Sequence, residues 1–301
     1  MCELSSHEFP CVPMSSSLIA MGKRRKRPET FSPATWRLLH SGNQDGPTNL
    51  ALDEAILAAV AAGDSPPTLR FYGFAPACIS LGYEQEWDGL DWDACEAEGW
   101  QIVRRSSDSR AILHVDDLNY ALYVPLTDPR AAGDAAATAR RINLGLEYGL
   151  INLGVDPTRM QPFYIDTGEL GFGSFDGPSV YNIVAGQLNL LASAQWRFGQ
   201  ALLQHGSLPL SGDVGRIATA LFFDMPGQRW ATHLRLGRRA VALNGVLGQI
   251  KSFAEASVAL ADGLGEVLDL SFVSGELSAR EQEQASRLRT KYADERWTKK
   301  F

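Results

Sequence analysis

The chain has 301 residues, of which 45% are hydrophobic and 21% charged, and its formal net charge at pH 7 is −7. Such a chain can bury a large core, which excludes a disordered or fibrous protein. From residue 31 onward there are 23 basic and 32 acidic side chains. This acidic body argues against nucleic acid as a partner.

The first segment, residues 1–33, shows no hydrophobic period and holds five of the 28 basic residues within 22–27. We expect a disordered, solvated tail; a tether to an anionic surface and a localisation signal are the alternatives. No run of about 18 apolar residues exists, so no membrane span is expected. Residues 14–21 are too short and polar for a signal peptide.

The chain has four cysteines, at 2, 11, 78 and 95, and they form no CxxC pair. Unpaired thiols are typical of a reducing compartment, so we expect a cytoplasmic protein. No metal site and no permanently bound cofactor are expected.

Apolar spacing and turn residues predict the elements of the first half. In chain order these are a strand at 36–39, a helix capped by Thr48 or Asn49 and ended by 63–67, strands at 68–72 and 78–82 in a hairpin-like pair, a helix at 90–98, and strands at 101–104, 111–114 and 118–125.

The second half continues with strands and then becomes chiefly helical after residue 214. We expect a helix at 137–153, antiparallel strands at 181–184 and 188–191, a strand at 201–210, and helices at 252–268 and 278–292. Hairpin-like strands with interspersed helices indicate an α+β fold rather than a doubly wound parallel sheet.

Two polar clusters stand out as candidate functional residues. The first is the turn Arg104-Arg105-Ser106-Ser107-Asp108-Ser109, followed by a strand that ends at His114. Arginines can pair with carboxylates or phosphates, and a histidine can act as an acid or a base. By itself, this segment is better explained as a polar turn with a satisfied histidine.

The second cluster contains Ala192, Ser193 and Ala194, followed by His205-Gly206-Ser207. Small residues allow a ligand to approach the backbone, and His-Gly-Ser supplies a ring nitrogen, a permissive backbone and a hydroxyl. Taken alone, this cluster is also weak evidence.

Together with their surroundings, the clusters resemble the lipoate–protein ligase and octanoyltransferase family. The resemblance runs from residue 36 to residue 298. It includes the segments Asn49-Leu50-Ala51-Leu52-Asp53-Glu54-Ala55, Thr68-Leu69-Arg70-Phe71-Tyr72, Ile79-Ser80-Leu81-Gly82-Tyr83, Pro178-Ser179-Val180-Tyr181-Asn182-Ile183 and Ser193-Ala194-Gln195.

The resemblance implies a biotin/lipoate-ligase-like catalytic domain at 34–301, with a mixed, mostly antiparallel sheet, packed helices and a helical C-terminal part. It also implies transfer of octanoyl or lipoyl groups to a lysine of a carrier domain. The implied partners are acyl carrier protein, lipoyl carrier domains or both. In that setting Ser174 and Asn189 stand at the catalytic positions. The residues implied to bind substrate are Arg104, Arg105, Ser107, Asp108, Ser109, His114, Ala192, Ser193, His205 and Gly206.

Three departures from the family pattern bear on activity. Asp108 and Ser109 replace two glycines of the first loop, which places a carboxylate where an adenylate phosphate would lie and argues against ATP or AMP as a ligand. Asn189 stands where the family has an essential lysine. Ser174 stands where the acyl-thioester branch has a cysteine, and a serine without a base is a poor nucleophile.

The sequence therefore leaves several hypotheses. One is a family member whose own reaction is lost or reduced. Another is an active acyltransferase in which His205 or His114 activates Ser174 and Asn189 polarises the carbonyl. A third is a non-catalytic protein that binds acyl groups or carrier domains and regulates the pathway. An adenylating, biotin-ligase-like enzyme is disfavoured by the same departures.

Overall fold

The computed structural model describes residue 27 and residues 29–156, 158, 172–176, 179, 181–225 and 227–301. The strands are β1 Ala34–Gln44, β2 Thr68–Phe74, β3 Cys78–Leu81, β4 Gln101–Arg104, β5 Ile112–His114, β6 Asp117–Pro125, β7 Ile183–Ala185, β8 Leu188–Phe198, β9 Ala201–Pro209 and β10 Leu270–Ser274. The helices are α1 Gly46–Ala62, α2 Trp92–Ala97, α3 Ala135–Asn152, α4 Gln228–Gly237, α5 Leu243–Leu247, α6 Phe253–Leu268, α7 Ala279–Ala293 and α8 Glu295–Thr298.

The main sheet has seven strands in the order β10-β1-β2-β6-β9-β8-β7. β1 is parallel to both β10 and β2, whereas each later neighbour is antiparallel. The parallel pair β1 and β2 is joined through α1, as a parallel connection requires a crossover. The α+β class and the mixed, mostly antiparallel sheet are thereby confirmed.

A second sheet of three strands has the order β4-β3-β5. The hairpin-like pairing predicted for 68–72 and 78–82 is wrong, because β2 lies in the large sheet and β3 in the small one. Every residue of β3 is buried. Its apolar run therefore identified a core strand but carried no information about its partner.

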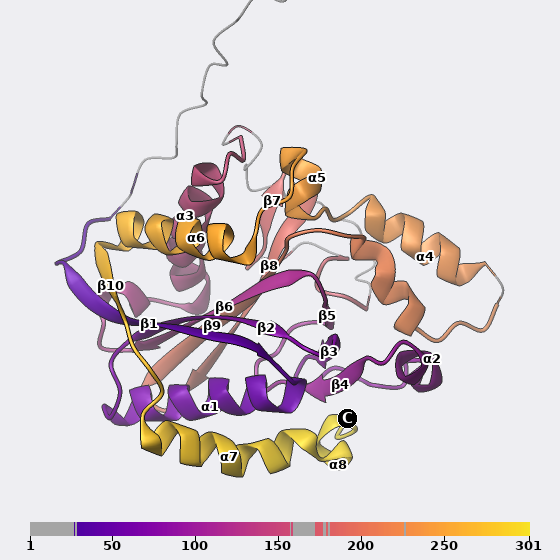
Figure 1. The fold of residues 1–301 in the computed structure, drawn as a ribbon, viewed down its shortest axis with the longest axis horizontal. Coiled ribbons are helices and arrows are strands. Elements are labelled where there is room, and N and C mark those ends of the chain that lie inside the picture. The colour runs from indigo at the N-terminus through magenta and orange to yellow at the C-terminus, as the bar shows by residue number, and fades with distance from the viewer. Residues whose placement is uncertain are drawn as a thin grey trace, which may run out of the picture.

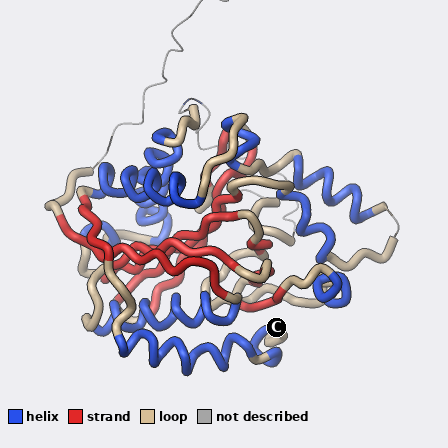
Figure 2. Tube along the Cα trace, in the orientation of Figure 1, coloured by secondary structure: helices blue, strands red, loops and turns tan. Residues whose placement is uncertain are grey.

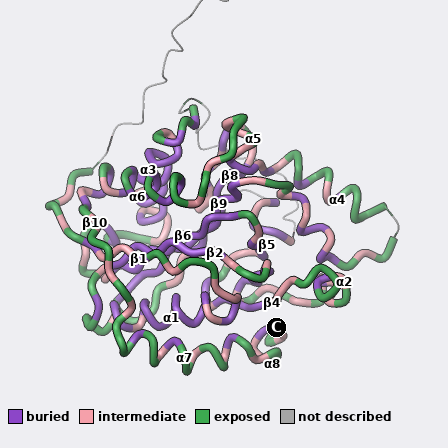
Figure 3. Tube along the Cα trace, in the orientation of Figure 1, coloured by how far each residue is buried: buried purple, intermediate pink, exposed green. Residues whose placement is uncertain are grey.

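Helices cover both faces of the large sheet (Figures 1 and 2). α3 and α6 pack on one face, and α1 packs on the other, with α7 outside it. The largest apolar cluster lies between the sheet and α3 and α6. The chain is most buried along the central strands and α1, as Figure 3 shows.

The helices begin and end at residues that cap them, and the sequence predicted these residues only in part. α1 starts at Gly46, and its N-cap is Asp45, not Thr48 or Asn49, because the Asp45 carboxylate accepts a hydrogen bond from Thr48 N at 2.7 Å. α1 ends at Gly63, which has φ +77°. The helical C-terminal part is confirmed, but the prediction missed β10, which adds parallel to β1.

Arg27 and Glu29, near the start of the described chain, contact the body. Arg27 forms an ion pair with Asp269, and Glu29 forms one with Arg141. Of the helices that the structure describes, none has the length and apolar character needed to cross a membrane.

The contact between α3 and α6 depends on glycine. A Cβ atom built on Gly263 would lie 2.1 Å from Gly149 N and 2.4 Å from Gly145 O. These atoms belong to the backbone, so no side-chain rotation can relieve the overlap. We predict that Gly263→Ala lowers the free energy of unfolding by about 1–3 kcal/mol, the usual cost of overpacking a core, as measured by urea denaturation.

Gly237→Ala is the control, because nothing lies within 4 Å of the Cβ position at Gly237. We expect this variant to be unchanged or slightly more stable. Equal stability of the Gly263→Ala and Gly237→Ala variants would contradict the close packing of α3 on α6.

Candidate functional site

A buried carboxylate, Asp53 of α1, lies at the centre of the polar layer between α1 and the large sheet. It forms an ion pair with Arg70 of β2 at 2.6 Å and accepts a hydrogen bond from Tyr123 OH at 2.6 Å. A ring nitrogen of His205, Nδ1, lies 3.0 Å from the second carboxylate oxygen, and Tyr72 OH lies 3.3 Å from it.

Burial acts to raise the pKa of Asp53, but the hydrogen bond from His205 and the charge of Arg70 outweigh it, so the pKa lies below its ordinary value. Asp53 is therefore an anion at neutral pH. A carboxylate can only accept hydrogen bonds, so His205 Nδ1 carries the proton that faces Asp53.

The other ring nitrogen of His205 reaches the first polar cluster. Nε2 lies 2.6 Å from Ser107 Oγ, and both residues are buried. In the neutral imidazole Nε2 is an acceptor, so the Ser107 hydroxyl donates to it. The structure thus joins residues 98 positions apart, one from each cluster.

The two arginines of the first cluster hold the loop in place. Arg104 donates to the carbonyl oxygens of Gly82, Tyr83 and Gln85, and also to that of Thr298 near the C-terminus.

Arg105 donates to the carbonyl oxygens of Ser80 and Arg110. Burial lowers the pKa of Arg105 to about 10, and the charge of Asp108 acts in the opposite direction. Arg104 and Arg105 thus organise the loop through backbone carbonyls.

His114 belongs to a second, similar line of contacts. Its Nδ1 lies 2.9 Å from Asp117 Oδ2, and its Nε2 lies 2.9 Å from Ser80 Oγ. The ring stacks on Phe74 with a centroid distance of 4.1 Å. Ser207 Oγ also donates to Asp117, at 2.7 Å. His114 thereby connects the small sheet to β6 and β9.

The second cluster is divided between the two faces of the large sheet. Ala194 of β8 is paired with His205 of β9, and Ser193 is paired with Gly206. Paired residues share a face and successive residues alternate. Ala192 and His205 therefore face α1 and the small sheet.

Ser193 and Gly206 face α3, on the opposite side of the sheet. Ser193 Oγ lies 2.8 Å from Tyr120 OH, whose ring belongs to the core cluster on that side. A Cβ atom on Gly206 would lie 2.5 Å from Ala192 O and 2.7 Å from Ser193 Oγ. Glycine at 206 therefore permits close packing of β9 on β8.

Ser174 lies beside the first loop. Its hydroxyl donates to Arg110 O at 2.5 Å and lies 3.3 Å from Ser109 Oγ. Its backbone N–H donates to Ala111 O at 2.8 Å. Asp108 is exposed, and Ser109 is half-buried.

Asn189, at the start of β8, is hydrogen-bonded to the same segment as Ser174. Its Nδ2 donates to Phe175 O at 3.0 Å, and its Oδ1 accepts from Asn182 Nδ2 at 3.2 Å. Asn182 Nδ2 also donates to Ser174 O. Ser174 and Asn189 are thus linked through neutral hydrogen bonds.

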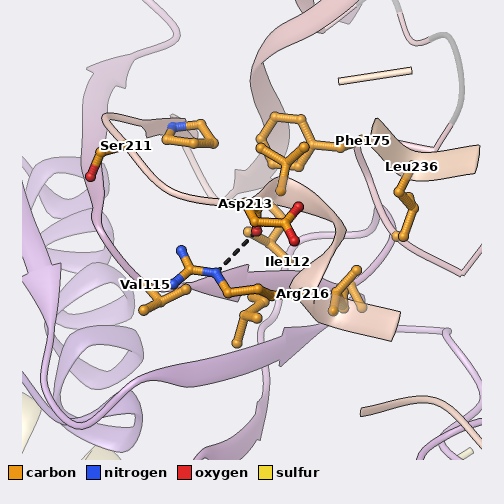
Figure 4. Close-up of a pocket in the computed structure, with 13 residues that line it drawn as sticks. Ile112, Val115, Phe175, Ser211, Asp213, Arg216 and Leu236 are labelled. Carbon is orange, nitrogen blue, oxygen red and sulfur yellow. Dashed lines mark hydrogen bonds between the residues drawn. The ribbon is translucent and has the colours of Figure 1, made fainter. Parts of the chain in front are cut away.

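An adjoining pocket lies next to Ser174 and is largely apolar (Figure 4). It is lined by residues on and beside β5, by residues on either side of Ser174, and by residues between the end of β9 and α4. The side chains that Figure 4 labels are Ile112, Val115, Phe175, Ser211, Asp213, Arg216 and Leu236. The side chains that line it are mostly apolar, but the space it encloses is little larger than a water molecule.

The sequence interpretation missed four charged or polar residues of this site: Asp53, Arg70, Asp117 and Asp176. Asp176 is buried and forms ion pairs with Arg235 and Arg239 of the α4 region, at 2.8 and 2.7 Å. One signal was available, since Arg70 stands inside an apolar strand and Asp53 inside an apolar helix. Charges that are fully buried must be paired.

The fold corresponds to that of lipoate–protein ligases. The structure superposes on a bi-partite lipoate protein ligase from Thermoplasma acidophilum, solved in a study with its E2 lipoyl domain, with TM-score 0.73 and 23% identity, covering 88% of this chain and 96% of that one. A lipoate-protein ligase A bound with ATP gives TM-score 0.71 and 24% identity, covering 88% and 99%. These likenesses define the fold.

Sequence comparison gives the family. The sequence profile described as "Lipoyl protein ligase A/B catalytic domain" matches residues 45–264. Octanoyltransferase LipM from Kyrpidia tusciae is 37% identical over 270 residues, covering 87% of this chain and 98% of the relative. The LipM of Symbiobacterium thermophilum is 36% identical over 275 residues, covering 87% and 97%. The chain belongs to the lipoyl protein ligase A/B catalytic-domain family, a family of lipoate and octanoyl transferases of protein lipoylation.

The pairing of Asp53 with Arg70 gives a stability prediction. Asp53→Asn removes the negative charge and leaves the Arg70 guanidinium buried beside a neutral amide. We expect the free energy of unfolding to fall by about 3–5 kcal/mol, the cost of breaking a buried ion pair, in urea denaturation at neutral pH.

Asp64→Asn is the control, because Asp64 and its partner Arg280 are both exposed. It should lower the stability by less than about 1 kcal/mol. If the Asp53 and Asp64 variants lose the same small amount, Asp53 does not anchor the site.

Proposed function

We propose that this protein binds an octanoyl or lipoyl group on its carrier but has lost, or retains only weakly, the transfer reaction of its family. The proposal rests on the hydrogen bonds of Ser174 and Asn189, which are made to backbone carbonyls and to a side-chain amide. By resemblance these residues occupy the positions of the family's cysteine and lysine. The domain that performs this role is proposed to span residues 34–301.

Ser174 is poorly placed to act as a nucleophile. Its hydroxyl proton is directed to the carbonyl oxygen of Arg110, and a carbonyl cannot remove it as a base would. A serine hydroxyl needs an adjacent general base to attack a carbonyl. The alternative, an active acyltransferase that uses Ser174, therefore lacks its activating group in this arrangement.

The two histidines proposed as activators of Ser174 have other partners. His205 binds Ser107 and Asp53, and His114 binds Ser80 and Asp117. Each ring has both nitrogens engaged. Activation of Ser174 would require one of these networks to break.

Asn189 supplies no positive charge. Its amide nitrogen donates to Phe175 O instead of pointing to an incoming group. Removing one donor that stabilises a developing oxyanion costs on the order of 10²–10³ in rate. The loss of this positive charge and the absence of a thiol at position 174 together support a much slower transfer reaction.

Use of ATP is also disfavoured, although a solved neighbour of this fold is described as bound with ATP. Arg104 and Arg105 direct their guanidinium groups at backbone carbonyls, and Asp108 adds a negative charge at the turn. We therefore propose that the acyl group is the ligand and that no adenylate forms.

Binding is supported by membership of the lipoyl protein ligase A/B catalytic-domain family and by the small side chains of β8 near His205. Acyl carrier protein and lipoyl domains are the proposed partners, and the neighbour from Thermoplasma acidophilum was solved in a study of a ligase and its E2 lipoyl domain. A regulatory protein that binds without reacting fits the same features. The buried thiols of Cys78 and Cys95 are free, which supports a reducing, cytoplasmic location.

The first test is transfer itself. The full-length protein is incubated with octanoyl-acyl carrier protein and an apo lipoyl domain, and the lipoyl domain is weighed by intact mass spectrometry. We expect no octanoylation above the no-protein control, because the site lacks both thiol and lysine. Octanoate should still raise the melting temperature. Octanoylation above the control would overturn the proposed loss, and an unchanged melting temperature would overturn acyl binding.

The second test restores the family residues. We predict that Asp108→Gly, Ser109→Gly, Ser174→Cys and Asn189→Lys, combined, increase octanoylation of the lipoyl domain at least about 100-fold over the starting protein. The matched control keeps the glycines and the lysine but retains Ser174, and it should stay inactive. A fully folded combined variant without a gain would show that these positions do not explain the loss.

A further inference from the structure

A carboxylate, a histidine and a serine of the site are linked one after another by hydrogen bonds. Asp53 accepts from His205 Nδ1 at 3.0 Å, and His205 Nε2 lies 2.6 Å from Ser107 Oγ. Both distances fall within the range for a working base and nucleophile. The same constellation of roles activates serine in unrelated hydrolases and is recognised by geometry rather than by sequence order.

We propose that Ser107 is the nucleophile of a serine-dependent thioester hydrolysis, with His205 as general base and Asp53 as the positioning residue. The substrate class is a medium-chain acyl thioester such as an octanoyl thioester. This inference goes beyond the proposed function, on which it rests only for the choice of acyl chain. It places the reactive group on the first loop and away from Ser174.

The steps balance without a cofactor. Ser107 Oγ attacks the thioester carbonyl, and its proton moves to His205 Nε2. The carbon–sulfur bond breaks, and the departing sulfur takes that proton to leave as a free thiol. Water then attacks the acyl ester of Ser107, gives one proton to His205, and releases the carboxylic acid while the proton returns to Ser107.

The buried charge of Asp53 supports this role for His205. Arg70 and Tyr123 bind Oδ1 of the carboxylate, whereas His205 contacts Oδ2. The anion fixes the tautomer in which Nε2 is unprotonated and can accept the serine proton. It also stabilises the imidazolium that forms when the proton has moved.

The second histidine series does not offer an equivalent nucleophile. Ser80 lies within β3, in the middle of the small sheet, and Arg105 donates to both its carbonyl oxygen and its hydroxyl. Ser107 lies outside the strands, in the turn between β4 and β5.

An unused donor lies on the same face. Asn119 of β6 is buried, and its Nδ2 has no hydrogen-bond partner among the described residues. It is paired with Ser207, two residues from His205 along β9, so its side chain faces the same layer. A buried unpaired amide is costly, so this donor is available to a polar group that enters the layer.

The test uses the octanoyl thioester of N-acetylcysteamine and the full-length protein. Intact mass spectrometry after rapid acid quenching should detect one added octanoyl group, and peptide mapping should place it on Ser107. Thiol release, followed with a thiol reagent, should exceed the no-protein rate. Ser107→Ala should abolish the adduct and reduce thiol release by about 10³-fold or more.

Ser80→Ala is the matched control, since it removes the other serine that contacts a histidine. It should retain the adduct and change thiol release only a few-fold. An adduct on Ser174, or thiol release unchanged by Ser107→Ala in a folded protein, would overturn the proposal. If octanoate raises the melting temperature but no adduct forms, the inference fails while the proposed binding function stands.

Asp53 is tested as a positioning residue at a temperature where Asp53→Asn remains folded by circular dichroism. We expect acylation of Ser107 to fall on the order of 10²–10⁴-fold while octanoate still raises the melting temperature. Loss of binding and acylation in equal measure would indicate a purely structural role for Asp53.

Discussion

A single buried carboxylate determines how this site is assembled. Asp53 cannot remain ionised in the interior without partners, and it obtains them from three strands of the large sheet. The pairing with Arg70 fixes α1 on β2, and the contact with His205 extends the network to β9. His205 in turn reaches Ser107, so that the turn of the first loop is tied to the sheet through one charge. The loop's own arginines complete this attachment by donating to backbone carbonyls. The site is therefore rigid for the same reason that α1 is docked.

Local features of this fold could be predicted from the sequence, whereas long-range pairings could not. The helix of residues 137–153 and the hairpin of β7 and β8 follow from apolar spacing and a glycine turn, and the structure contains both. β3 is buried on all sides, so its apolar run does not show that its partners are β4 and β5. Strand alternation also separates neighbours that look like one motif. His205 and Gly206 are adjacent in sequence but face opposite sides of the sheet.

The resemblance to a known family named candidate site residues, but it did not predict which groups their side chains contact. The arginines of the first loop look like ligands for a carboxylate or phosphate, yet in the folded chain Arg104 and Arg105 bind main-chain oxygens. Hydrogen-bond partners depend on distances between segments that are far apart in sequence, and residue type alone does not give them. For the same reason, the sequence did not identify Asp53 as a residue of the site. Its charge is visible in the sequence, but its contact with His205 appears only when α1 lies on β9. The site thus combines a loop that is firmly attached to the sheet with neutral groups at Ser174 and Asn189.

The central claim is that the protein keeps an acyl-group site and does not pass the group to a lysine. It is tested most directly with an octanoyl thioester labelled with ¹³C at the carbonyl carbon, mixed with the full-length protein and an apo lipoyl domain. Carbonyl NMR distinguishes a bound thioester, an ester, a carboxylate and an amide in one spectrum. The account predicts that the thioester signal shifts or broadens in the presence of the protein and that no amide signal grows. An amide signal that appears with time, or a thioester signal that the protein leaves unchanged, would contradict it.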